Sequence, residues 1–355
     1  MFKVFFPVIG SFFDPLLVFA IGLFGGFLSG FLGIGSGIMI TPVLMEFGIH
    51  PLFAVSNQIC HAVGVNMTNF LMYKREQDVD FHLASYILFG GGLGAVCEWF
   101  ILMRSGGTPD NAPRTFATIY ATVLVILGIT MLVQSIKAWR EGMGRKYADG
   151  VMMRRWMLYL PLHKIFVRSR TEMSVTIPIF VGFVAGVLVS YLGGGENLLM
   201  APVITYLIGR VSSVVNGTTA LAGCVIASLV AMIYACSNYC CDIEFVMILF
   251  AGATLGSWLG VKLSYNVRRC YVTSLASITI FLMASRQIFK LINNSLTPIL
   301  APQIPARNSF FADIAHDTPM LYTITCIFLV TITALISEKI LLWLTNMGSK
   351  RRAQR

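Results

Sequence analysis

Two short glycine-rich segments carry the residues that could do chemistry in this chain. The second segment follows the first by 160 residues, and both interrupt apolar runs; the residues concerned are Gly33, Gly35, Ser36 and Gly37, then Gly193, Gly194, Gly195, Glu196 and Asn197. A helix that restarts after such a break presents free backbone N–H groups, here near Ser36 and Asn197, and helix N-termini favour anions. The pattern therefore predicts a cradle for a small oxyanion, built from two helix ends.

The two breaks belong to longer matching stretches, residues 22–44 and 182–204. Eight of 23 aligned positions are identical, and most of these are Gly or Pro. Two apolar segments interrupted by glycine at corresponding places in two halves are typical of transporter binding sites. For Gly22, Gly26 and Gly30, which are spaced by four, we favour close packing between helices over a binding role.

The apolar segment after each break begins with polar residues. These are Ser56, Asn57 and Gln58 in the first half and Asn216, Thr218 and Thr219 in the second, and at the offset of 160 residues Ser56 pairs with Asn216 and Gln58 with Thr218. Asn57 and His61 share one helical face, which must meet protein or water rather than lipid. Asn57 and Thr218 are therefore candidates for substrate binding, and helix–helix hydrogen bonding is the alternative. His61 is a candidate for proton coupling, or a structural buried histidine.

Intramembrane carboxylates are costly and are functional candidates by default. Glu196 lies at the tip of the second break, and we interpret it as a candidate for proton coupling because an ionised carboxylate would repel an anion. Asp80 and Asp242 precede apolar segments and suit helix N-caps. Glu98 and Glu338 lie near predicted helix ends, where we expect them to reach toward the interface.

The composition is that of a membrane protein. Hydrophobic residues make up 56% of the 355 residues and charged residues 12%, and the mean hydropathy is +0.77. Soluble domains carry about 25% charged residues, so this chain could not cover a soluble surface. The net charge of +10 is concentrated between apolar segments, which argues against nucleic acid as a partner.

No cofactor, metal centre or enzymatic motif is predicted. The eight cysteines show no CxxC or Cys/His spacing typical of a metal site, and we interpret them as small buried apolar residues. A disulfide or redox role for the group Cys236, Cys240 and Cys241 is the alternative. GIGSG lacks the GK[ST] of a phosphate-binding loop, and neither GxSxG nor HExxH occurs.

Nine apolar segments are long enough to approach a membrane span of about 20 residues. They are 15–33, 52–73, 82–103, 117–138, 175–193, 213–237, 243–263, 270–289 and 320–345, with shorter pieces at 38–48 and 197–208. Residues 137–170 carry nine Lys/Arg and two acids, and the C-terminus is also basic, so both are expected in the cytoplasm. Within this loop, residues 151–168 suggest an interfacial helix.

Because the basic central loop and the C-terminus are both expected in the cytoplasm, the chain must cross the membrane an even number of times between them. The number is even only if 175–193 and 197–208 form a re-entrant broken hairpin. We therefore predict an all-α polytopic membrane protein with two inverted-topology repeats, each a glycine-broken hairpin plus about three transmembrane helices. The expected parts are a first repeat (1–138), a basic cytoplasmic loop (139–174), a second repeat (175–292), an extracytoplasmic loop (293–319) and an extra helix with a basic tail (320–355).

The repeated break resembles the sulfite exporter (TauE/SafE-like) family, also called the toluene sulfonate uptake permease family. The resemblance covers about 15–290 and rests on GFLSGFLGIGSGIMITPVLMEFGI, on GGGENLLMAPVI, and on the Asp-led segments 80–103 and 242–263. It implies a multi-pass permease of the plasma (inner) membrane that moves sulfite, a sulfonate or a related organic anion. Glu196-Asn197 and the long basic loop depart from the family pattern and leave the substrate open.

The expected function is therefore secondary transport of a small anion across the bilayer, without enzymatic activity and without a cofactor. Two alternatives stay open: a transporter of a cation or neutral solute that uses Glu196 and His61, or a non-transporting membrane scaffold. The expected partners are the anionic solute and lipid, with a homodimer as one candidate assembly.

Overall fold

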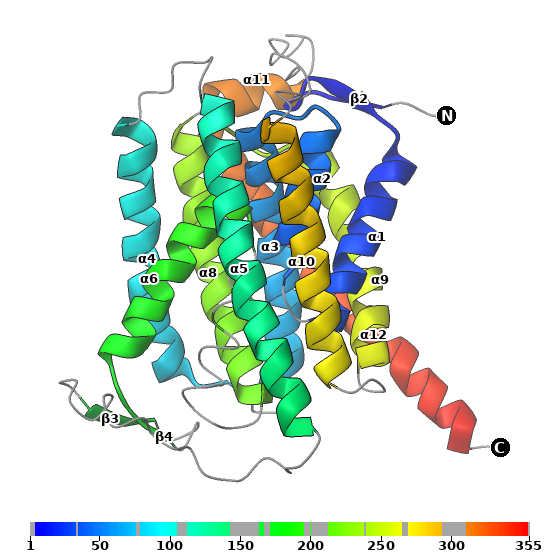
Figure 1. The fold of residues 1–355 in the computed structure, drawn as a ribbon. Helices are drawn as coiled ribbons and strands as arrows, with labels where there is room; N and C mark the ends of the chain where they lie inside the picture. Colours follow the sequence, from blue (N-terminus) through cyan, green and yellow to red (C-terminus); the bar gives the residue numbers. More distant parts are fainter. Residues whose placement is uncertain are drawn as a thin grey trace.

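The computed structural model describes most of the chain. The described residues are 4–32, 35–75, 79–104, 112–142, 163–166, 171–194, 200, 212–237, 239–264, 269–292 and 310–353. Within these ranges the chain forms eleven helices and two short antiparallel strand pairs (Figure 1). The helical fold predicted from the sequence is confirmed.

The first half begins with a strand pair that the sequence did not indicate, and five helices follow it. The elements are β1 (Val4–Phe6), β2 (Ser11–Phe13), α1 (Pro15–Leu32), α2 (Gly37–Glu46), α3 (Pro51–Arg75), α4 (Phe81–Arg104) and α5 (Ala112–Gly142). β1 and β2 pair through the register Val4 to Phe13. Phe6 and Phe13 pack edge-on against Phe245, so the strand pair covers one end of the bundle.

The described part of the second half contains helices that correspond in order to α1, α3, α4 and α5, followed by two more. Its elements are β3 (His163–Phe166), β4 (Thr171–Ser174), α6 (Thr176–Leu192), α8 (Ser212–Cys236), α9 (Ile243–Ser264), α10 (Arg269–Ile292), α11 (Phe310–Asp317) and α12 (Pro319–Ala353). The predicted interfacial helix over 151–168 is wrong at its C-terminal end, because His163–Phe166 pairs with β4 as a strand. Residues 151–162, and the short helix expected at 197–208 apart from Met200, lie outside the described residues.

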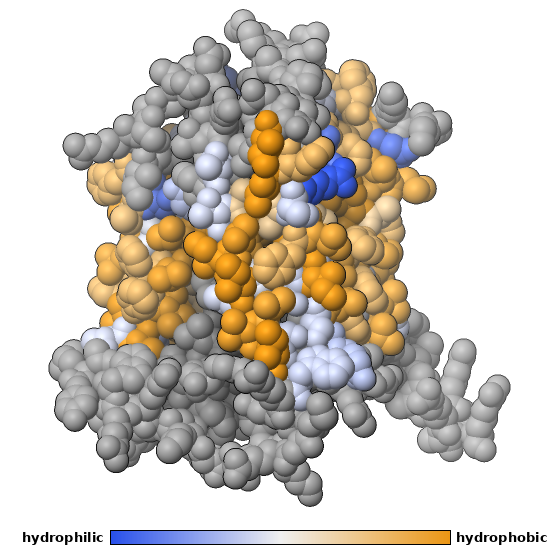
Figure 2. Space-filling view, viewed as in Figure 1, coloured by the Kyte–Doolittle hydropathy of each residue, from blue (hydrophilic) through white to orange (hydrophobic). Residues whose placement is uncertain are grey.

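Apolar side chains cover the sides of the bundle. Figure 2 shows them as a band across the middle height of the visible face. Within the described residues, four helices are long and apolar enough to cross a membrane: Phe81–Phe100, Gly217–Cys236, Ile243–Gly260 and Pro319–Ile340. Shorter apolar stretches lie in α1, α5, α6 and α10. Because such a band is stable only against lipid, the fold is that of a multi-pass membrane protein.

The helices pack in pairs that link the two halves. α1 packs against α9, and α6 packs against α4, while α3 packs against α8 and α5 against α10. Exchanging the first half for the second therefore reproduces the same set of pairs. In Figure 1, α1 descends from the β1–β2 end of the molecule, whereas α6 rises from the β3–β4 end, where the C-terminus also lies.

Glycines make the close packing of α1 against α9 and of α4 against α6 possible. In the α1–α9 seam, a Cβ added at the facing glycines would collide with a backbone carbonyl of the other helix; these are Gly22, Gly26 and Gly30 on α1 and Gly252, Gly256 and Gly260 on α9. The α4–α6 seam repeats the arrangement with Gly90 and Gly94 on α4 and Gly182 and Gly186 on α6. The packing role expected for the α1 glycines is confirmed, because only glycine lets two helix backbones approach so closely.

We expect the change Gly26→Leu to destabilise the bundle, because the new side chain would meet the backbone of Ala253, which cannot rotate away. Overpacking of this kind costs roughly 1–3 kcal/mol or more. The measurement is thermal unfolding of the detergent-purified protein, followed by tryptophan fluorescence. Gly92→Leu is the matched control, since the nearest atom to a Cβ there, Leu229 Cδ1, is 4.0 Å away. Equal melting temperatures for the two variants would contradict the seam.

Candidate functional site

The first glycine break produces a helix N-terminus inside the protein. α2 begins at Gly37, and Ser36 is its N-cap residue. Gly35 has φ of 85°, a left-handed backbone conformation that residues other than glycine rarely adopt. The glycine therefore allows the chain to turn here. The hydroxyl of Ser36 does not cap its own helix. It is therefore available to other groups.

The second break lies directly against the first. α6 ends at Leu192 because Gly193 adopts φ of 72° and its N–H donates to the Val189 carbonyl, a glycine cap. A Cβ added at Gly37 would lie 2.8 Å from the carbonyl atoms of Gly194. The two breaks therefore meet at Gly37 and Gly194, whereas the second helix N-terminus, expected near Asn197, lies outside the described residues.

A hydrogen bond fixes this contact. Thr41 Oγ1 of α2 donates to the carbonyl oxygen of Leu192, at 2.7 Å. That carbonyl belongs to the last turn of α6, where helical carbonyls have no intrahelical donor. A side chain near the start of α2 therefore supplies the hydrogen-bond donor that the last turn of α6 lacks.

The buried side chains of α3 form a polar chain with Ser36. Gln58 Nε2 donates to Ser36 Oγ at 3.0 Å, and Ser36 Oγ lies 3.4 Å from His61 Nδ1. Since the serine hydroxyl accepts from Gln58, its own proton can be donated to Nδ1 of His61. With Nδ1 as the acceptor of that proton, the histidine proton lies on Nε2.

Two atoms at the ends of this chain have no hydrogen-bond partner. They are Gln58 Oε1 and His61 Nε2, both fully buried within the described part of the protein. An unpaired buried polar group costs about 1–3 kcal/mol, so such atoms are uncommon in folded proteins unless something binds them. Here an unpaired donor and an unpaired acceptor lie beside the N-terminus of α2. The arrangement can bind a small polar solute that both accepts and donates hydrogen bonds.

Gln58 is a member of this polar chain to which the sequence assigned no role. It belongs to the polar start of α3, where the sequence favours its neighbour Asn57 as the site residue. A helix turns about 100° per residue, so adjacent side chains face different neighbours. The signal that could have identified Gln58 is the glycine at position 193. The Gln58 side chain occupies the space that a Cβ of Gly193 would fill.

Asn57 and Thr218 have structural partners instead. The backbone N–H of Asp242 donates to Asn57 Oδ1 at 2.8 Å, and the backbone N–H of Asp80 donates to Thr218 Oγ1 at 3.0 Å. Asn57 thus holds Asp242, which precedes α9, and Thr218 holds Asp80, which precedes α4. The two hydrogen bonds correspond to each other when the first half is exchanged for the second. These contacts favour the alternative in which Asn57 and Thr218 make hydrogen bonds between helices rather than bind a substrate.

Several predicted residues lie outside the described residues, so their positions carry no argument. They are Gly33, Gly195, Glu196 and Asn197. Of the two candidates for proton coupling, His61 alone is therefore placed, and it lies in the polar chain with Ser36. Glu98 and Glu338 do not reach toward an interface as expected, because they are 3% and 7% exposed and packed among helices.

The two helix-leading aspartates have the structural role predicted for them. Asp80 Oδ1 accepts the N–H groups of His82 and Leu83, as an N-cap does. Asp242 Oδ1 accepts the N–H of Phe245, and its Oδ2 accepts the N–H of Val8 in the turn between β1 and β2. Burial raises the pKa of Asp242 to about 6, although these hydrogen bonds lower it. Its proton is therefore held more tightly in the folded protein than in the unfolded chain.

We expect the stability of this end of the bundle to fall as the pH rises from about 4 to about 6. The folded carboxyl binds a proton there that the unfolded one has lost, because the pKa of Asp242 is raised from 3.8 to about 6. The measurement is the melting temperature of the wild-type protein and of Asp242→Asn across this range. The variant should show the shallower decline, and parallel curves would refute the assignment.

An apolar helical bundle around two broken segments, with a polar site where they meet, defines a membrane transporter. A family model for the sulfite exporter TauE/SafE matches residues 18–286. The chain therefore belongs to the sulfite exporter TauE/SafE family of membrane transporters. It is 24% identical over 201 residues to the probable membrane transporter protein YjnA of Bacillus subtilis (strain 168), covering 57% of this chain and 71% of that protein. No solved structure matches the chain.

Proposed function

We propose that the protein is a secondary transporter of a small anion, such as sulfite, a sulfonate or a related organic anion, across the plasma membrane. The observation that carries the proposal is the pair of unpartnered, buried atoms beside the α2 N-terminus, Gln58 Oε1 and His61 Nε2. The two broken segments that meet there supply the surrounding backbone.

The chemistry of this site favours an oxyanion. An N–H on His61 Nε2 and the N–H groups at the α2 N-terminus are donors, and the helix dipole adds a partial positive charge. Gln58 Oε1 is an acceptor, which suits a protonated oxyanion or its bound water. Sulfite and sulfonate groups present several acceptor oxygens in a small volume, so they match a site that offers mainly donors.

Alternating access is proposed to follow from inverted-topology repeats. The corresponding glycine seams, α1–α9 and α6–α4, and the opposite courses of α1 and α6 support this arrangement. In such transporters the substrate lies at the interface of the repeats, and one repeat moves against the other around it. The basic segments beside β3 and at the C-terminus would then face the cytoplasm. Proton coupling through Glu196 or His61 belongs to the same proposal.

The test is anion uptake by the purified protein in proteoliposomes. We expect saturable uptake of at least one of three labelled anions, namely sulfite, an alkyl sulfonate and a short carboxylate, with mutual competition. The same anions should raise the melting temperature of the detergent-solubilised protein, because a ligand that binds only the folded state stabilises it.

Protein-free liposomes and a non-competing cation series serve as the controls. Uptake of none of the anions, with no shift in melting temperature, would rule out the proposed substrate class. Competition by cations alone would instead favour a transporter of cations. His61→Gln retains a neutral hydrogen-bonding side chain, so loss of pH dependence with retained uptake would assign proton coupling to His61.

A further inference from the structure

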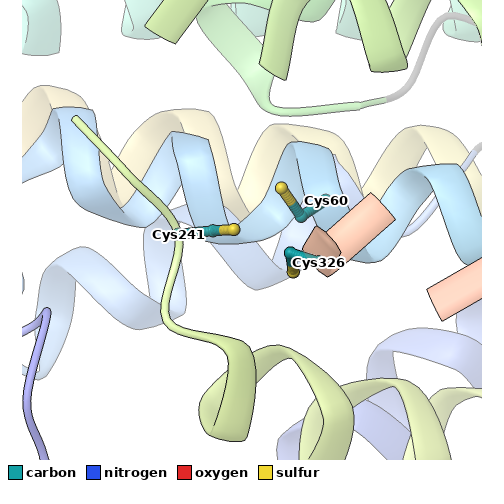
Figure 3. Close-up of side chains that lie close together, drawn as sticks. All are labelled: Cys60, Cys241 and Cys326. Atoms are coloured by element: carbon teal, nitrogen blue, oxygen red, sulfur yellow. The ribbon is translucent and has the colours of Figure 1, made fainter. Parts of the chain in front are cut away.

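Three cysteine thiols that the proposed transport site does not use lie together in the interior. Cys60 belongs to α3, Cys241 lies just before α9, and Cys326 belongs to α12. Their sulfur atoms all lie within 4.8 Å of one another, and all three residues are fully buried. Figure 3 shows the side chains approaching from three separate segments, with the sulfur of Cys241 directed toward the other two.

The segments that carry these thiols are fixed by neighbouring hydrogen bonds. The Asp242 N–H bonded to Asn57 holds the residue after Cys241 against α3. The Ile243 N–H donates to the Tyr322 hydroxyl at 3.3 Å, which ties the start of α9 to α12. The three sulfur atoms are therefore held in place by the fold, and a ligand would meet an organised set of donors.

The chemistry of the group selects one class of ligand. Thiolate sulfur is a soft donor that prefers Cu(I), Zn²⁺ and related ions over Mg²⁺ or Ca²⁺. A structural zinc site takes four ligands, whereas the grouped donors among the described residues are three. Burial also penalises net charge, and a monovalent ion with one thiolate and two thiols is neutral. Three buried sulfurs thus suit a monovalent soft ion better than a divalent one.

We propose that Cys60, Cys241 and Cys326 form a binding site for a monovalent soft metal ion of the Cu(I) or Ag(I) type. Binding forms one metal–thiolate bond and releases one thiol proton to solvent, and the other two sulfurs complete the coordination as neutral donors. No electron is transferred. The ion links α12, which lies beyond residues 18–286 that match the family, to α3 and to the start of α9.

The test is Cu(I) binding to the full chain under anaerobic conditions, by competition with a coloured Cu(I) chelator. The parent carries Cys97→Ala, Cys236→Ala and Cys270→Ala, which remove thiols outside the group. We expect one equivalent of Cu(I) per chain and a rise in melting temperature. Cys60→Ser, Cys241→Ser and Cys326→Ser should each abolish this binding.

Cys240→Ala is the matched control, because Cys240 is also buried but its thiol faces the Ala315 carbonyl at 3.7 Å. It should bind Cu(I) as the parent does. Copper X-ray absorption on the parent gives a readout that needs no further variant, and sulfur-only coordination is expected. Nitrogen or oxygen neighbours, unchanged binding in the serine variants, or a parent that binds no Cu(I) because two of the thiols form a disulfide would each overturn the proposal.

Discussion

Gln58→Leu is expected to reduce anion uptake roughly 10- to 100-fold while leaving the protein folded. The substitution keeps the volume of the side chain and removes both the Nε2 donor to Ser36 and the unpaired Oε1. Hydrogen bonds that involve a charged partner contribute about 1.5–3 kcal/mol, and every 1.4 kcal/mol corresponds to a factor of ten. The effect is expected in both the affinity and the rate, because the same amide orients Ser36 toward His61.

The measurement is the initial rate of uptake into proteoliposomes over a range of anion concentrations. Gln287→Leu on α10 is the matched control, since Gln287 is also buried but lies outside the polar chain of the site. It should transport at the rate of the wild type, normalised to reconstituted protein. If Gln58→Leu transports as well as Gln287→Leu does, the site does not lie at the meeting of the breaks.

Gly37→Ala is expected to reduce transport on the order of 100-fold through geometry alone. One added methyl group would lie 2.8 Å from the carbonyl carbon and oxygen of Gly194, closer than real Cβ atoms come to backbone. Both partners are backbone at the break, so the two segments must separate. Displacement of binding groups by about 1 Å is enough to reduce the rate of an enzyme on the order of 100-fold, and we expect a similar loss here.

Gly128→Ala separates this effect from a general intolerance of larger residues. A Cβ at Gly128 meets the ring of Phe281 at 3.3 Å, and a side chain can shift by a few tenths of an ångström where backbone cannot. Gly128→Ala should therefore transport normally. Gly37→Ala should elute as a monodisperse protein from size exclusion and yet show this loss of uptake, and normal uptake would mean that the contact between the breaks is not needed.

The sequence alone determined where the helices run and where they break. Apolar length and the flanking charges predicted the bounds of α1, α3, α4, α8 and α9 to within two residues of those observed. Glycine located the start of α2 and the end of α6, because it acts on the backbone at its own position. Asp80 and Asp242 were recognised as N-caps for the same reason, since a cap bonds to N–H groups only two or three residues away.

Only the tertiary structure decided which side chains meet. Gln58 rather than Asn57 bonds to Ser36, and Asn57 instead accepts a hydrogen bond from Asp242. The thiols of Cys60, Cys241 and Cys326 come together from segments that no spacing relates. Helical periodicity assigns residues to a face of their own helix, but the neighbour of that face depends on the packing of distant segments. The local pattern of the chain therefore fixes most of its helices, whereas the proposed binding groups meet only where α2, α3 and α6 pack together.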